Sequence, residues 1–147
     1  MNEIPPSEPA DSLPQIHNDR DLYECWRIML GELGFTERTL WVAFILPDGT
    51  VIPHVVQVAE APQFPSVEDI TALYAMCTRE LAYFGSEASI ALLLTRPGAD
   101  VVTDSDRAWG VSMANASRTT GIRTHPLHLA SDKALRVLAP DDLIGAA

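Results

Sequence analysis

The stretch ALLLTRPGADVVTDSDRAW, residues 91–109, decides the fold because it leads from a buried strand through a short loop into a helix. The apolar run stops at Thr95, and Arg96-Pro97-Gly98 begins the loop. The sequence Thr103-Asp104-Ser105-Asp106 then begins the helix. Strand ends that open into such loops are where α/β proteins often place their chemistry. Residues 96–106 are therefore the first candidate for a functional site.

The sequence predicts three long helices and five strands around this loop. A helix from Asn18 to Gly34 has apolar residues at spacings of three and four, and two more helices cover 66–84 and 103–120. Each of these two begins at a hydroxyl residue and ends before a glycine. The strands are predicted at 39–46, 51–58, 89–95, 122–130 and 134–139. The order α-β-β-α-β-α-β-β predicts an α/β (α+β) class of fold, with a mixed sheet and helices packed on it.

Length and composition indicate one globular domain. The chain has 147 residues, of which 47% are hydrophobic and 20% charged. Residues 1–16 hold four prolines and several acids, which predicts a disordered acidic tail before a single domain at 17–143. Residues 144–147 form a short second tail. Pro53 lacks an amide donor, which predicts an edge position or a bulge near the start of the second strand.

Net charge and cysteine content limit the possible partners of the chain and its cellular compartment. The formal net charge of −10 argues against binding to a nucleic-acid backbone. No apolar stretch approaches the roughly 18 residues that span a bilayer, and the N-terminus has neither the basic region nor the apolar core of a secretory signal. These features predict a cytoplasmic protein. Cys25 and Cys77 fall on apolar helix faces, which favours buried reduced thiols over a disulfide or a metal pair.

Four short motifs occur in a defined order along the second half of the chain. They are residues 94–98, Leu-Thr-Arg-Pro-Gly; residues 103–106, Thr-Asp-Ser-Asp; residues 121–123, Gly-Ile-Arg; and residues 127–129, Leu-His-Leu. With this spacing, the chain from Leu40 to Leu143 resembles the JAB/MPN metalloprotease family, closest to its bacterial RadC-like branch. The resemblance implies a layered fold like that of cytidine deaminases. In that family His-x-His-Pro and Ser-x-x-Asp occupy the first two positions and supply the three zinc ligands.

The chain departs from the family pattern at the residues that hold the metal. Leu94 and Arg96 stand where the two histidines should be, and Thr103 and Asp106 stand where the Ser and Asp should be. Leucine cannot ligate zinc, and a guanidinium repels it. The resemblance also implies a catalytic Glu on an early strand, and Glu37 is the weak candidate, about two residues from that position. These four positions are a remnant of the family's metal site. They predict that the chain binds no cofactor and has no catalytic residue.

Asp106 has two further interpretations. In the structural one, Thr103 and Asp106 form a capping box, and the helix dipole favours an acid in the first turn. In the second, Arg96 occupies the place of the vacated metal and pairs with Asp106. In a third interpretation, the pocket beside Arg96 is a ligand-binding site for a small anion or a carboxylate. Asp106 then does not pair with Arg96.

Two functions remain open from the sequence. The first is a non-catalytic protein-interaction or scaffold module, since the resemblance implies scaffold and dimer roles for metal-free members. Its partner is an unknown protein or a second copy of the chain, bound through residues 96–106 or an edge near Pro53. The second is a metal-dependent hydrolase of isopeptidase type, with a remodelled site of Asp106, His125 and His128. No nucleotide-binding loop or serine-nucleophile motif occurs.

Overall fold

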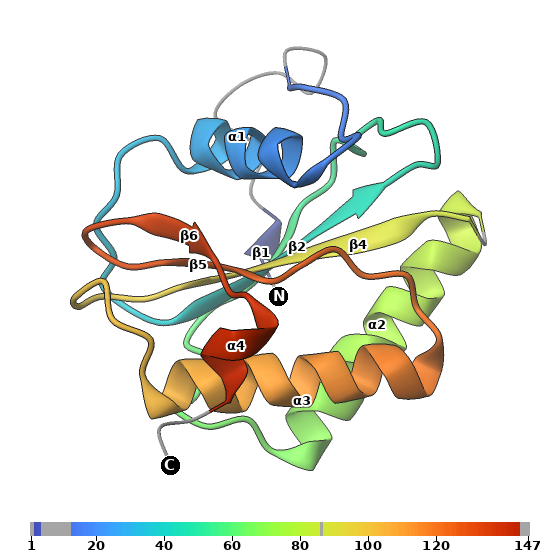
Figure 1. The fold of residues 1–147 in the computed structure, drawn as a ribbon. Helices are drawn as coiled ribbons and strands as arrows, with labels where there is room; N and C mark the ends of the chain where they lie inside the picture. The colour runs from blue at the N-terminus through green and yellow to red at the C-terminus, as the bar shows by residue number, and fades with distance from the viewer. Residues whose placement is uncertain (1, 4–12, 86, 145–147) are drawn as a thin grey trace.

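A computed structural model describes residues 2–3, 13–85 and 87–144 of the chain. It is a mixed α+β protein in which helices cover both faces of one sheet (Figure 1). The elements are β1 (Asn2–Glu3), α1 (Asp19–Leu30), β2 (Thr39–Ile45), β3 (Val56–Val58), α2 (Val67–Phe84), β4 (Ser89–Thr95), α3 (Asp104–Thr120), β5 (His128–Ala130), β6 (Leu135–Val137) and α4 (Pro140–Leu143). No helix in the described ranges combines the length and the apolar character needed to cross a membrane.

The sheet is built around β2 and β4. Its strand order is β1-β3-β2-β4-β5-β6 across the described residues. β2 and β4 pair antiparallel along all seven residues, from Thr39 opposite Thr95 to Ile45 opposite Ser89. The pairing of β4 with β5 is parallel, because α3 crosses over between them. β4 is therefore one of the two central strands, and the candidate loop leaves the sheet at its carboxyl end.

Two apolar cores lie on opposite faces of this sheet. One face of β4, with Ile90, Leu92 and Leu94, packs against α2 and α3. The other face, with Ala91 and Leu93, packs against α1. Every residue of β4 from Ile90 to Thr95 is buried, as the continuous apolar run predicts for a central strand. In Figure 1, α1 lies on one side of the sheet and α2 and α3 lie on the other.

The helix starts follow the sequence signals, but the end of the first helix does not. Ser66 and Thr103 cap α2 and α3, each in a capping box with the acid three residues later. The predicted end of the first helix at Gly34 is wrong, because α1 ends at Leu30. Gly31 adopts φ 64° there, and its N–H donates to the carbonyl of Arg27. Leu33 still packs against the core, but from the loop.

Three predicted strands are shorter in the structure. Regular pairing in the second one is confined to β3, and Val51 adds an isolated bridge to Ile45. Pro53 lies between these two pairings, where it has no amide proton to donate. The fourth strand shrinks to β5, with one bridge from Thr124 to Ile90. The last shrinks to β6, and the helix α4 follows where no element was predicted.

The predicted disordered tail, 1–16, falls partly on residues 1 and 4–12, which lie outside the described residues. Leu13 and Ile16 are buried against the α1 core, so the packed part of the chain begins before residue 17 and the predicted boundary is wrong. The two residues of β1 also pair with β3. In the C-terminal tail, residues 145–147 lie outside the described residues.

Candidate functional site

Arg96 and Asp106 form a buried ion pair at the carboxyl end of β4. Arg96 follows the last residue of the strand, and Asp106 lies in the first turn of α3. Arg96 Nη2 lies 2.7 Å from Asp106 Oδ2, and Arg96 Nε lies 2.8 Å from Oδ1. The two side chains are 5% and 0% exposed. The predicted pairing of these residues is confirmed, with the fork-to-fork geometry that makes such pairs strong.

Every N–H donor of Arg96 is used inside the chain. A guanidinium has five N–H groups. Nε and one Nη2 proton bind Asp106, Nη1 donates to the carbonyls of Pro97 and Ala99, and Nη2 also donates to that of Val101. The hydrogen bonds with Asp106 hold the pKa of Arg96 above its usual value. The predicted small-anion site at Arg96 is wrong, because no donor remains for the anion.

Asp106 serves the start of α3 as well as Arg96. Its Oδ2 accepts the backbone N–H of Thr103 at 2.9 Å, and its own N–H donates to Thr103 Oγ1 at 3.1 Å. The capping-box interpretation is therefore confirmed together with the ion pair. Both carboxylate oxygens are occupied by donors within the chain. The guanidinium of Arg96 lies against both of these oxygens, and its fixed positive charge repels a metal cation.

A second carboxylate, Asp132, holds the candidate loop from the other side. Its Oδ2 accepts the N–H of Gly98 at 2.8 Å, and its Oδ1 accepts the N–H of Phe35 at 2.9 Å. These bonds, that from Gly98 first, lower the pKa of Asp132. No motif in the sequence pointed to this residue. The only sequence signal for Asp132 was that an acidic residue occurs in the turn before β6. The two segments that it joins, at Gly98 and at Phe35, are far apart in sequence.

The hollow beside the loop does not contain the predicted catalytic acid. It has a volume of about 470 Å³ and is lined by the loop, the first turn of α3, Gln63 and Arg38. Glu37 is half-buried in the connection before β2 and is not among the lining residues. The neighbouring side chain, Arg38, lines the hollow instead, and a cation there does not act as a base.

The structure does not bring Asp106, His125 and His128 together. His128 is buried on the α1 face, with its ring centre 6.4 Å from that of Tyr23. Asp106 lies on the opposite face, at the start of α3. No group of three His, Cys, Asp or Glu residues that could hold a metal occurs within the described ranges. The alternative zinc site is therefore wrong, since the sheet separates its ligands.

One polar pair that the sequence did not predict lies at the other end of β4. Ser89 Oγ lies 2.9 Å from His125 Nε2, although the two residues are 36 positions apart. Burial lowers the pKa of His125, which favours the neutral ring. A nucleophile–base pair also needs an acid that orients the histidine. Among the described residues, no hydrogen bond joins a carboxylate to His125, so the pair is incomplete as a catalytic site.

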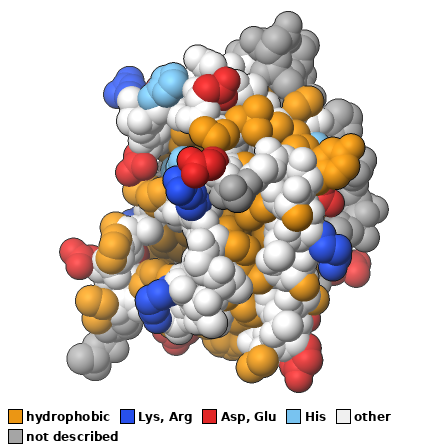
Figure 2. All heavy atoms as spheres, turned by 90° about the vertical axis from the view of Figure 1, so that its right-hand side faces the viewer, with side chains coloured by type: hydrophobic (Ala, Val, Ile, Leu, Met, Phe, Trp, Pro, Cys, Tyr) orange, Lys and Arg blue, Asp and Glu red, His pale blue; other side chains and the backbone are white. Residues whose placement is uncertain are grey.

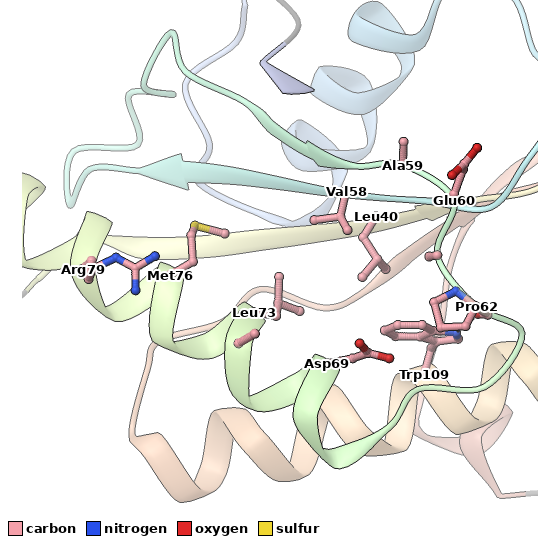
Figure 3. A pocket seen from close by; sticks show the side chains of 12 residues that line it. Leu40, Val58, Ala59, Glu60, Pro62, Asp69, Leu73, Met76, Arg79 and Trp109 are labelled. Carbon is pink, nitrogen blue, oxygen red and sulfur yellow. The ribbon is translucent and has the colours of Figure 1, made fainter. Parts of the chain in front are cut away.

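A largely apolar groove lies between α2 and the sheet edge, with a volume of about 550 Å³. In Figure 3, Leu73 and Met76 point from α2 toward Leu40 of the sheet, and Trp109 closes one end. Trp109 Nε1 donates to the carbonyl of Pro62 at 3.1 Å, which fixes the connection before α2. Three charged residues, Glu60, Asp69 and Arg79, are also among its lining residues.

The geometry of the loop thus defines a closed structural site within a mixed α+β domain. No protein-family model matches the sequence, and no curated protein matches it. The JAB/RadC-like resemblance stays a prediction from the motifs.

Proposed function

We propose that the chain is a non-catalytic protein-interaction module, with a JAB/RadC-like fold in which the Arg96–Asp106 pair replaces the metal. The complete internal use of Arg96 carries this proposal. At one expected ligand position stands Arg96, a cation whose five N–H groups all donate hydrogen bonds within the chain. At the other stands Leu94, a buried side chain with no atom that can bind a metal. The residues present therefore do not fit zinc.

The charge of the chain supports a protein partner rather than a nucleic acid. A net charge of −10 repels a phosphate backbone. A cytoplasmic location belongs to the same proposal. Cys25 and Cys77 are free and buried, and they belong to the two cores on opposite faces of the sheet. Because the sheet separates the two thiols, they do not form a disulfide with each other. Free thiols are the usual state of cysteines in a reducing compartment.

Elemental mass spectrometry on the untagged protein tests the proposal. The wild-type chain, dialysed after exposure to excess zinc, is expected to retain far less than one zinc per chain. It is also expected to leave an isopeptide-linked substrate uncut. Close to one zinc per chain, lost in Asp106→Ala and kept in the matched surface variant Asp104→Ala, would overturn the proposal. Hydrolysis that a chelator abolishes would do the same.

A further inference from the structure

Arg38 stands out among the charged side chains at the hollow beside the candidate loop. Three charged residues line this hollow, and they are Arg38, Arg96 and Asp104. Arg96 is paired with Asp106, and the Asp104 carboxylate lies 2.6 Å from Arg107. Within the described ranges, no ion pair and no side-chain hydrogen bond includes Arg38. The hollow therefore presents one positive charge that the chain does not compensate.

The Nε–H group of Arg38 also lacks a hydrogen-bond acceptor. The residue is half-buried just before β2, and its Nε atom is buried without a partner in the part of the chain that the structure describes. Because water does not reach this atom, a donor of a charged group stays unsatisfied, which is rare and costs free energy. An acceptor with a negative charge satisfies the N–H group and compensates the guanidinium together. The ligand chemistry that suits this side chain is therefore an oxyanion.

The other lining residues favour one kind of oxyanion. Phe64 and Val101 line the same hollow and are 52% and 60% exposed, so they offer apolar surface beside the cation. A doubly charged phosphate would be repelled by the Asp104 carboxylate and by the net charge of −10 more strongly than a singly charged group. The two oxygens of a carboxylate also match the guanidinium fork. A carboxylate attached to an apolar group therefore fits the hollow best.

Hydrogen bonds fix the walls of the hollow before any ligand binds. The carbonyl of Arg38 accepts the N–H of Ala61 at 2.8 Å, which holds the backbone of Arg38. On the loop side, Arg96 donates to three loop carbonyls, and Asp132 accepts the N–H of Gly98. The volume of about 470 Å³ lies in the range of ligand pockets. A preorganised pocket loses less conformational entropy on binding than a mobile one.

The opposite end of the molecule offers no comparable cation. Figure 2 faces the end away from the candidate loop, and the Lys and Arg groups there lie singly, without gathering into a patch. Near the start of β4, at that end, Arg123 lies 3.7 Å from Glu87. The two side chains are 63% and 69% exposed, so water also satisfies their polar atoms. Arg38 differs in both respects.

We propose that Arg38 and the hollow beside it bind a carboxylate that a protein partner presents next to an apolar side chain. The inference rests on the proposed interaction function and gives the chemistry of the partner. The guanidinium turns toward the hollow, so that Nε and one Nη group donate to the two carboxylate oxygens. The apolar side chain packs on Phe64 and Val101. The Arg96–Asp106 pair forms the adjoining wall and donates nothing to the ligand.

NMR titration of the ¹⁵N-labelled protein tests this, because the Nε–H signal of Arg38 reports directly on an acceptor. N-acetyl-leucine, which has a carboxylate beside an apolar side chain, is the probe. It is expected to shift the Arg38 signal and to move the Nε–H signal of Arg96 far less. N-acetyl-leucinamide, which lacks the charge, is expected to bind at least tenfold more weakly. Acetate, which lacks the apolar group, is expected to bind more weakly as well.

Two variants with the same change of charge separate this site from the general field of the protein. Arg38→Gln is expected to weaken the binding of N-acetyl-leucine at least tenfold, as followed at the backbone amides of the loop. Arg79→Gln is the matched control, because this arginine is exposed and lines the groove between α2 and the sheet edge. It is expected to leave the binding unchanged. Circular dichroism checks that both variants are folded.

Several results would overturn the proposal. They are an Arg38 signal that millimolar N-acetyl-leucine does not shift, equal binding of the amide, and an equal loss of binding in Arg79→Gln. Acetate that binds as tightly as N-acetyl-leucine would point to a free small anion and would overturn the assignment to a partner. A zinc-free chain without the Arg38 shift contradicts the carboxylate site alone, whereas a zinc-bound hydrolase contradicts the proposed function.

Discussion

Replacing Asp106 by alanine would leave the Arg96 guanidinium buried without its counter-charge. The three loop carbonyls would remain as acceptors, but they are dipoles rather than charges. The exposed fractions of the two side chains, 5% and 0%, mean that water does not replace the carboxylate. Removing one partner from a buried ion pair costs about 3–5 kcal/mol, because the other charge is left uncompensated.

That magnitude is large against the stability of the whole domain. Domains of this size unfold with roughly 5–15 kcal/mol, so a loss of about 3–5 kcal/mol removes at least a fifth of the total. At about 2–4 °C for each kcal/mol, the unfolding midpoint is expected to fall by roughly 6–20 °C. Urea unfolding followed by circular dichroism, with wild type and variant at pH 7, measures the same loss as a free energy.

Asp104→Ala is the matched control for this substitution. Asp104 lies in the same helical turn and pairs with Arg107 at 2.6 Å, but its side chain is 87% exposed. A surface pair contributes about 0–1 kcal/mol, so the control is expected to change the midpoint little. A loss in Asp106→Ala no larger than that in Asp104→Ala would refute the reasoning. Adding Arg96→Met to Asp106→Ala removes the orphaned charge and is expected to restore part of the lost stability.

Four further outcomes are expected. Gly49→Ala should cost about 2 kcal/mol or more in thermal unfolding, since φ is 93° and the new Cβ would lie 2.7 Å from a backbone oxygen. Gly31→Ala, with φ 64° and ψ −124° but open space around it, should cost about 1–3 kcal/mol from backbone strain alone. Burial lowers the pKa of His128 below 6.5, so the unfolded chain binds more protons just below that pH and stability falls as pH drops from 7 to 5. A flatter pH profile is expected for His128→Gln, and an unchanged one would contradict this. Burial raises the pKa of Cys25 and Cys77 to about 12, so a thiol reagent at pH 8 should label them only after unfolding in urea.

The elements that the sequence predicted well are those with local signals. The starts of α2 and α3 follow from a hydroxyl and an acid three residues apart, and the capping boxes at Ser66 and Thr103 are present. The seven-residue β4 follows from its continuous apolar run. The end of α1 was misplaced because two glycines follow the helix, and the choice between them depends on which one the backbone turns at.

Strand lengths and the closed state of the site depend on partners distant in sequence. β3 and β5 are short because their neighbours pair with only part of each apolar run. The Arg96–Asp106 contact was predictable, since both residues flank one loop. The use of the other Arg96 donors was not, because the positions of the loop carbonyls follow from the folded backbone. The hydrogen bond between Ser89 and His125 could not be predicted either, because no motif links two residues that are 36 positions apart.

The buried pair also influences the connection that leads into α2. Asp106 fixes the first turn of α3, where the Ser105 hydroxyl donates to the carbonyl of Gln63. One turn further along, Trp109 donates to the carbonyl of Pro62. Both acceptors lie in the connection just before α2, so the start of α3 positions the start of α2. Asp106→Ala is therefore expected to speed amide hydrogen exchange at the start of α2 as well as at the start of α3, whereas Asp104→Ala leaves both nearly unchanged. Exchange that speeds in α3 alone would show that α2 is held by the Tyr74 hydrogen bonds to α3 and not by the contacts with the start of α3.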